Sequence, residues 1–159
     1  MISIVRATPA HIGVIANRMR EHDVEECRAM GHEPKPALRS AMRHSSEVWT
    51  AKVDGRPEAM FGIVVTSALG GEGKPWMLGS DEIYRHPRAM LRSGHLLLNR
   101  WLDSTPYLSG LVSLRNSRAI RMLRRWDCQI GEEVIMLAGT EFASFTLDRP
   151  RRATHQGVR

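Results

Sequence analysis

Apolar residues recur along the chain at two different spacings, and the changes between them predict the order of strands and helices. The first segment, ISIVRAT, alternates as a β-strand does. Thr8 is a residue type that caps helices, and Pro9 is a type favoured in a first helical turn. Helix is therefore expected to follow the first strand directly.

Helical spacing continues in the next part of the chain. It runs from Ile12 to Met19, begins again after Asp23, which is predicted to cap a segment ending at Gly31, and resumes after Pro36 to about His44. Two apolar, β-branched runs then flank Asp54-Gly55 within EVWTAKVDGRPEAMFGIVV. This dipeptide predicts a tight hairpin turn.

The glycine-rich stretch GGEGKP is expected to link this hairpin to a further strand, WMLGSDEIY. The segment Pro87–Asp103 follows as a predicted amphipathic helix, with Arg88, Arg92 and His95 on its polar face. The apolar face should pack on a sheet and comprises Met90, Leu91, Gly94, Leu97, Leu98, Trp101 and Leu102.

The remaining segments predict a strand at YLSGLVSL, a helix capped by Asn116, and two strands, EEVIMLAG and EFASFTL, that meet near Gly139. The full order is strand, two helices, three strands, helix, strand, helix and two strands. This order indicates a mixed α/β fold, and a chain of 159 residues fits one domain, here expected over residues 1–147.

The net charge of +6 is uneven along the chain, because the last segment, DRPRRATHQGVR, carries +3 of it. Residues 148–159 are therefore expected to form a basic, disordered tail, whose charge either binds polyanions weakly or has no function. Arg118, Arg121 and Arg125 add a basic face to the helix after Asn116, but no nucleic-acid motif accompanies them, so nucleic-acid binding ranks last.

No segment of the sequence has the length and apolarity of a membrane span or the pattern of an export signal, so a cytoplasmic protein is expected. Cys27 and Cys128 are far apart, and the histidines show no metal-ligand spacing. Two reduced thiols and no metal site are predicted.

The order of elements resembles that of the GNAT superfamily of N-acetyltransferases over nearly all of residues 1–147. The helix after the fifth predicted strand carries the more specific likeness, because Asn116, Ala119 and Ile120 match the family pattern there. The chain also resembles a GNAT-like family encoded by tailed bacteriophages and prophages, with some members known as internal virion proteins. GHEPKPAL, EAMFGIV, PWMLGSDEI and LVSLRNSRAIRML carry this second resemblance.

The resemblance implies a mostly antiparallel, twisted sheet of about six to seven strands flanked by about four helices, with acetyl-CoA as the cofactor. Its pyrophosphate would lie at the start of the long helix, where the family has a Gln/Arg-x-x-Gly-x-Gly/Ala loop. Here Arg88 and Met90 replace the two glycines. Arg85, Arg88 and Arg92 could gather a phosphate in their place, or form only a solvated first turn.

The resemblance also implies a carboxylate base at the end of the fourth strand, and Glu82 or Asp81 would fill this role. The alternative is a capping or salt-bridged pair. Asn116 would contact the cofactor or serve only as a helix cap. The tyrosine that serves as general acid in the family corresponds to Leu123, which cannot donate a proton.

Three functions follow as alternatives. The first is a phage or prophage N-acetyltransferase whose activity and acceptor amine the sequence leaves open. The second is a non-catalytic virion protein that keeps the fold and forms a homo-oligomer or binds other virion proteins. The third is a nucleic-acid-binding protein that would use Arg118, Arg121, Arg125 and the tail.

Overall fold

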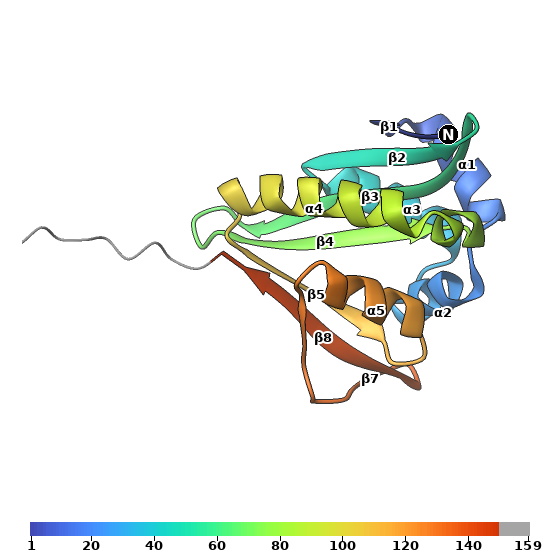
Figure 1. Cartoon of the computed structure of the whole chain (residues 1–159). Helices are drawn as coiled ribbons and strands as arrows, with labels where there is room; N and C mark the ends of the chain where they lie inside the picture. Colours follow the sequence, from blue (N-terminus) through green and yellow to red (C-terminus); the bar gives the residue numbers. More distant parts are fainter. Residues whose placement is uncertain (150–159) are drawn as a thin grey trace, which may run out of the picture.

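The computed structural model describes residues 1–149 as one sheet with helices on both faces (Figure 1). The eight strands follow the order β1-β2-β3-β4-β5-β8-β6, with β7 paired to β8. All neighbouring strands are antiparallel except β4 and β5, which are parallel. The strands are β1 Ile2–Arg6, β2 Glu47–Val53, β3 Arg56–Ser67, β4 Glu72–Gly79, β5 Tyr107–Ser113, β6 Gln129–Ile130, β7 Ile135–Leu137 and β8 Thr140–Asp148.

The helices divide between the two faces of the sheet. In chain order they are α1 Pro9–Asn17, α2 Glu21–Ala29, α3 Pro34–His44, a 3-10 helix η1 Asp81–Arg85, α4 Pro87–Ser104 and α5 Ser117–Arg125. α1 and α3 pack on one face through Ile12, Ile15 and Leu38. α4 and α5 cover the other face and lie next to each other, because Trp126 Nε1 at the end of α5 donates to Leu91 O of α4 at 3.1 Å.

Several predicted elements are confirmed. Asp54 and Gly55 have φ angles of 48° and 82°, as a two-residue hairpin turn between β2 and β3 requires. The long helix α4 buries Met90, Leu98, Trp101 and Leu102 as expected. Asn116 caps α5, with its side-chain oxygen accepting from Ala119 N at 3.4 Å.

The boundaries of other elements differ from the prediction. Three helices, rather than two, lie between β1 and β2, and the sheet has more strands than expected. β4 begins at Glu72 and ends at Gly79, because β3 provides backbone partners for residues of the predicted glycine-rich link. Asp81 and Glu82 therefore lie in a 3-10 helix and not on a strand. The predicted strand EEVIMLAG is reduced to β7, and a short β6 precedes it.

Two further predictions need correction or lie outside the described residues. Asp23 does not cap α2: Arg20 does, and Asp23 is buried in the first turn. β8 extends through Asp148, and Arg149 pairs with Asp103, so the start of the predicted tail belongs to the sheet. The rest of that tail, residues 150–159, lies outside the described residues. No helix in residues 1–149 combines the length and apolarity needed to cross a membrane.

Candidate functional site

The sheet opens between its two parallel strands. β4 and β5 pair only at Glu72 with Tyr107 and at Gly73 with Leu108, the positions where both strands begin. Beyond these pairs each strand keeps its outer neighbour, β3 for β4 and β8 for β5. We call the gap between the carboxyl-terminal parts of β4 and β5 the strand opening.

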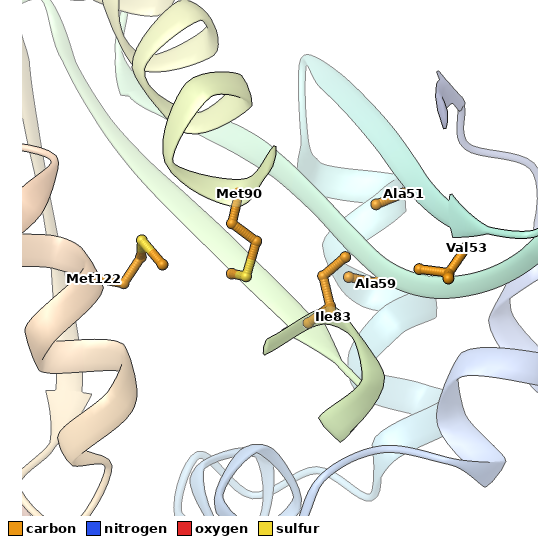
Figure 2. Close-up of a cluster of buried hydrophobic side chains, with 6 residues drawn as sticks. All are labelled: Ala51, Val53, Ala59, Ile83, Met90 and Met122. Atoms are coloured by element: carbon orange, nitrogen blue, oxygen red, sulfur yellow. The ribbon is translucent and has the colours of Figure 1, made fainter. Parts of the chain in front are cut away.

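A cavity of about 450 Å³ surrounds the strand opening and reaches both faces of the sheet. On the α4–α5 face its wall is mostly apolar and includes Met77, Met90 and Met122. Figure 2 shows Met122 on α5 pointing toward Met90 on α4, with Ile83 of η1 close to Ala59 of β3. On the α2–α3 face the wall includes Met30, Ala41 and Trp76.

A buried hydrogen-bonded network, which we call the polar bridge, joins the ends of the two diverging strands. It consists of Arg20, Asp23, Glu26 and Asn116. Asp23 Oδ2 accepts from Gly79 N at the end of β4 at 2.9 Å, and Glu26 Oε1 accepts from Ser113 N at the end of β5 at 3.1 Å.

Arg20 and Asn116 complete the polar bridge. Arg20 Nη1 donates to Asp23 Oδ1 at 3.2 Å and to Asn116 Oδ1 at 3.1 Å, and Asn116 Nδ2 donates to Glu26 Oε1 at 3.0 Å. The guanidinium of Arg20 also stacks on the Tyr84 ring, 4.2 Å from its centroid. Arg20 and Asn116 are 3% and 2% exposed, so the helix cap at Asn116 is closed off from solvent.

Local backbone contacts explain why the start of α2 supplies three of these four side chains. Arg20 N donates to Gly79 O at 2.9 Å, and Met19 forms an isolated antiparallel bridge with Ser80. The chain between α1 and α2 thus pairs with the end of β4. This pairing starts α2 beside the strand opening.

Burial changes the protonation of the polar bridge. It raises the pKa of Asp23 to about 7, against the opposing effects of Arg20 and of the Gly79 N–H, and it also raises the pKa of Glu26. The thiols respond in the same way, because burial raises the pKa of Cys27 to about 12 and that of Cys128 to about 11. Both cysteines are free and protonated at neutral pH, so neither is an activated nucleophile.

We predict that Asp23 makes folding stability fall as pH rises from about 4 to about 7. In this pH range the folded chain keeps a proton on Asp23 that the unfolded chain has lost. The pKa of Asp23 is about 7 in the folded chain, against the ordinary value of 3.8 for an unfolded one. The free energy of unfolding of the wild type, minus that of Asp23→Asn, should fall by up to about 1.4 kcal/mol per pH unit. Urea unfolding of both proteins across this range measures the difference, and parallel pH curves would contradict the assignment.

The carboxylates expected from the sequence lie outside the lining of this cavity. Asp81 has a side chain that is 75% exposed and approaches Arg20 Nε at 3.8 Å. Glu82 accepts from Arg85 Nη1 at 3.1 Å and lies 3.4 Å from His86 Nε2. Asp81 is therefore largely exposed to solvent, whereas Glu82 forms a salt-bridged cluster with Arg85 and His86.

The three arginines expected to hold a phosphate are all exposed, with Arg85 at the end of η1 and Arg88 and Arg92 in α4. Arg85 is engaged by Glu82, whereas Arg88 and Arg92 have no acidic partner within residues 1–149. α4 and α5 begin at the same end of the sheet (Figure 1), and the exposed Arg118 is in the first turn of α5. Pro87 is the first residue of α4 and has no N–H, so the start of this helix lacks one of the backbone donors that could bind a phosphate.

Sequence reasoning missed Arg20 and Glu26. Both contact Asn116, which is 96 and 90 residues away in the sequence, so local spacing could not reveal this part of the network. The signal in the sequence was weak: Asp23 and Cys27 are four residues apart on one helical face, which places an acid on the buried side. Within residues 1–149 no group of three or more His, Cys, Asp or Glu side chains could hold a metal ion.

Comparisons with known proteins agree with this architecture. No family model matches the sequence, and no curated protein matches it. Among solved structures, the chain is similar to aminoglycoside acetyltransferase AAC(6')-Ib in complex with coenzyme A, with a TM-score of 0.66, 14% identity and coverage of 94% of this chain and 95% of that one.

Two further structures show the same likeness. Ribosomal-protein-S5-alanine acetyltransferase from Vibrio fischeri has a TM-score of 0.66 and 11% identity, over 94% of each chain. An N-acetyltransferase from Staphylococcus aureus Mu50 has a TM-score of 0.61 and 9% identity, over 93% of this chain and 98% of that one. The chain therefore has the fold of the GNAT acetyltransferases, as its order of elements predicted.

Proposed function

We propose that this protein is an acetyl-CoA-dependent N-acetyltransferase. The observation that carries the proposal is the strand opening with its cavity, which passes from the α4–α5 face to the α2–α3 face of the sheet. A donor and an acceptor can approach each other through such a passage from opposite sides. The similar structure of AAC(6')-Ib contains coenzyme A, which supports the choice of cofactor.

The residues around the strand opening suit a cofactor with a slender arm and a polyanionic end. Met77, Leu97 and Ala119 line an apolar path, and Arg88 and Arg92 lie at the exposed start of α4 without acidic partners in the described chain. Acetyl-CoA would supply an activated acetyl thioester. Guanidinium groups would hold its phosphates where the family uses glycine backbone.

We expect acetyl-CoA to stabilise the folded chain. At about a hundred times the dissociation constant it should add roughly 2.7 kcal/mol, which for a domain of this size raises Tm by about 5 to 10 °C. Thermal unfolding with acetyl-CoA, and with triphosphate as the control for charge alone, measures the shift.

Matched variants sharpen this experiment. Replacing Arg88 and Arg92 by glutamine should remove most of the shift, whereas replacing Arg39 and Arg43, two exposed arginines on α3, should leave it intact. No shift at millimolar acetyl-CoA would count against the proposal. An equal Tm shift with triphosphate would show that the site binds polyanions in general and does not recognise acetyl-CoA.

The fold offers no observation that favours the virion role implied by the sequence resemblance. The three structures above are all acetyltransferases. A phage origin, incorporation into a virion and homo-oligomer formation stay expectations from the sequence, as does a cytoplasmic location.

A further inference from the structure

The two carboxylate oxygens of Glu26 have different surroundings. Oε1 accepts from Ser113 N and from Asn116 Nδ2, both neutral donors that hold the carboxylate in one orientation. Within residues 1–149, Oε2 has no hydrogen-bond partner and is not among the buried unpaired atoms, so it keeps some accessible surface, and Glu26 is one of the residues that line the cavity.

The charge of Glu26 is not matched by a contacting cation. Arg20 is directed to Asp23 and Asn116, and no salt bridge to Glu26 forms among the described residues. Burial raises the pKa of this carboxyl, against the opposing effects of its hydrogen bonds from Asn116 and Ser113 and of the charges of Arg20 and His22. A bound cation would relieve the cost of this burial.

The cavity wall shows what kind of cation fits. Neither lysine nor arginine lines the cavity in the described chain, and Asp23, which does, is already paired with Arg20. On the α2–α3 face, beside Glu26, the wall includes the apolar side chains of Met30, Ala37, Ala41 and Trp76 and the thiol of Cys27, together with three polar side chains, those of His32, Ser40 and His44. Such a wall suits a largely apolar body that carries one positive charge, and among the described residues it offers no lysine or arginine to an anionic group.

We propose that Glu26 binds the ammonium group of the acceptor and accepts its proton, and that the acceptor is a compact primary amine with an apolar body and no anionic group. The proposal rests on the proposed function and names the acceptor side of that reaction. It assigns the catalytic carboxylate to α2, in place of Asp81 or Glu82.

The proton and bond changes balance without another reactant. The ammonium gives one proton to Glu26 Oε2, and the neutral amine then attacks the thioester carbonyl. The new C–N bond forms, the C–S bond breaks, and the departing thiolate takes the second proton from the nitrogen. Glu26 releases the first proton to solvent, and the products are the acetamide and CoA.

Binding in the absence of acetyl-CoA tests the acceptor site independently of the cofactor. The probes are hexylamine, hexanol and hexanoate, which share one apolar body and differ in charge, titrated calorimetrically into the full chain. A charged hydrogen bond contributes roughly 1.5 to 3 kcal/mol, so hexylamine should bind about ten- to a hundredfold more tightly than hexanol. Hexanoate should bind more weakly than hexanol.

Three variants locate the charge. Glu26→Gln keeps an oxygen for the Ser113 and Asn116 donors and should bind hexylamine and hexanol alike. Glu25→Gln, one residue away and outside the cavity lining, should keep the wild-type preference. Ala41→Leu narrows the cavity on the α2–α3 face and should weaken the binding of all three probes, although Glu26 is unchanged.

Equal binding of hexylamine and hexanol by the wild type would overturn the proposal. So would an amine preference that survives Glu26→Gln but is lost in Glu82→Gln. If the protein prefers hexylamine but acetyl-CoA does not stabilise it, the amine site is supported and the proposed transferase reaction is contradicted. With both ligands bound, thiol release from acetyl-CoA should fall at least about tenfold in Glu26→Gln and stay near wild type in Glu25→Gln.

Discussion

Replacing Arg20 by methionine should lower the free energy of unfolding by about 3 to 5 kcal/mol near neutral pH, one of the largest effects expected for this chain. The side chain is buried and contributes the one cation of the polar bridge, where it contacts Asp23 and Asn116. Its removal leaves the carboxylates of Asp23 and Glu26 in a buried site without that cation. Urea unfolding of wild type and variant measures the loss.

Two controls separate lost charge from lost packing. The loss should be smaller near pH 5, because the pKa values of Asp23 and Glu26 are already raised and both then take up protons more readily. The double variant Arg20→Met with Asp23→Asn should recover part of the stability, since a neutral amide replaces an unpaired carboxylate. A loss that is independent of pH and of Asp23 would indicate that the contact with Tyr84 dominates.

Gly94→Ala should also destabilise the protein, by about 1 to 3 kcal/mol, although alanine is the better helix former. A methyl group at this position of α4 would lie 2.2 Å from Cε2 of Trp126, so the indole at the end of α5 would have to move. The same movement would break its hydrogen bond to Leu91 O.

Gly13 provides the matched control, because it also lies in a helix but has no neighbouring heavy atom within 4 Å of the place that an added methyl group would take. Gly13→Ala should therefore stabilise the protein by about 0.5 to 1 kcal/mol. Thermal or urea unfolding of both variants measures whether each substitution raises or lowers the free energy of unfolding. Stabilisation by both substitutions would show that the Trp126 side chain moves aside without loss of stability.

Local chemistry explains which elements could be predicted from the sequence. The turn at Asp54-Gly55, the amphipathic pattern of α4 and the cap at Asn116 each depend on neighbouring residues, and each is confirmed. The start of β4 could not be found in this way. Gly73 and Pro75 are poor strand formers, and their place in the sheet comes from pairing with β3.

The candidate site depended still more on distant contacts. The roles of Asn116 as a cap and of Ala119 as a helix-face residue were visible in the sequence, but the two carboxylates chosen there lie on η1, and Glu26 was not considered. Met122 shows the same limit within a single helix. Its packing against Met90 depends on how α5 sits beside α4, which the spacing along α5 does not determine (Figure 2).

The short pairing of β4 with β5 has a consequence for how the molecule comes apart. Only the two residue pairs at their starts join the strands from β1 to β4 with the strands from β5 to β8. The two half-sheets are otherwise held together by side chains: the α4–α5 packing on one face and the polar bridge on the other. Amide protons within each half-sheet should therefore exchange as two separate cooperative units, and a ligand that bridges them would merge these units into one.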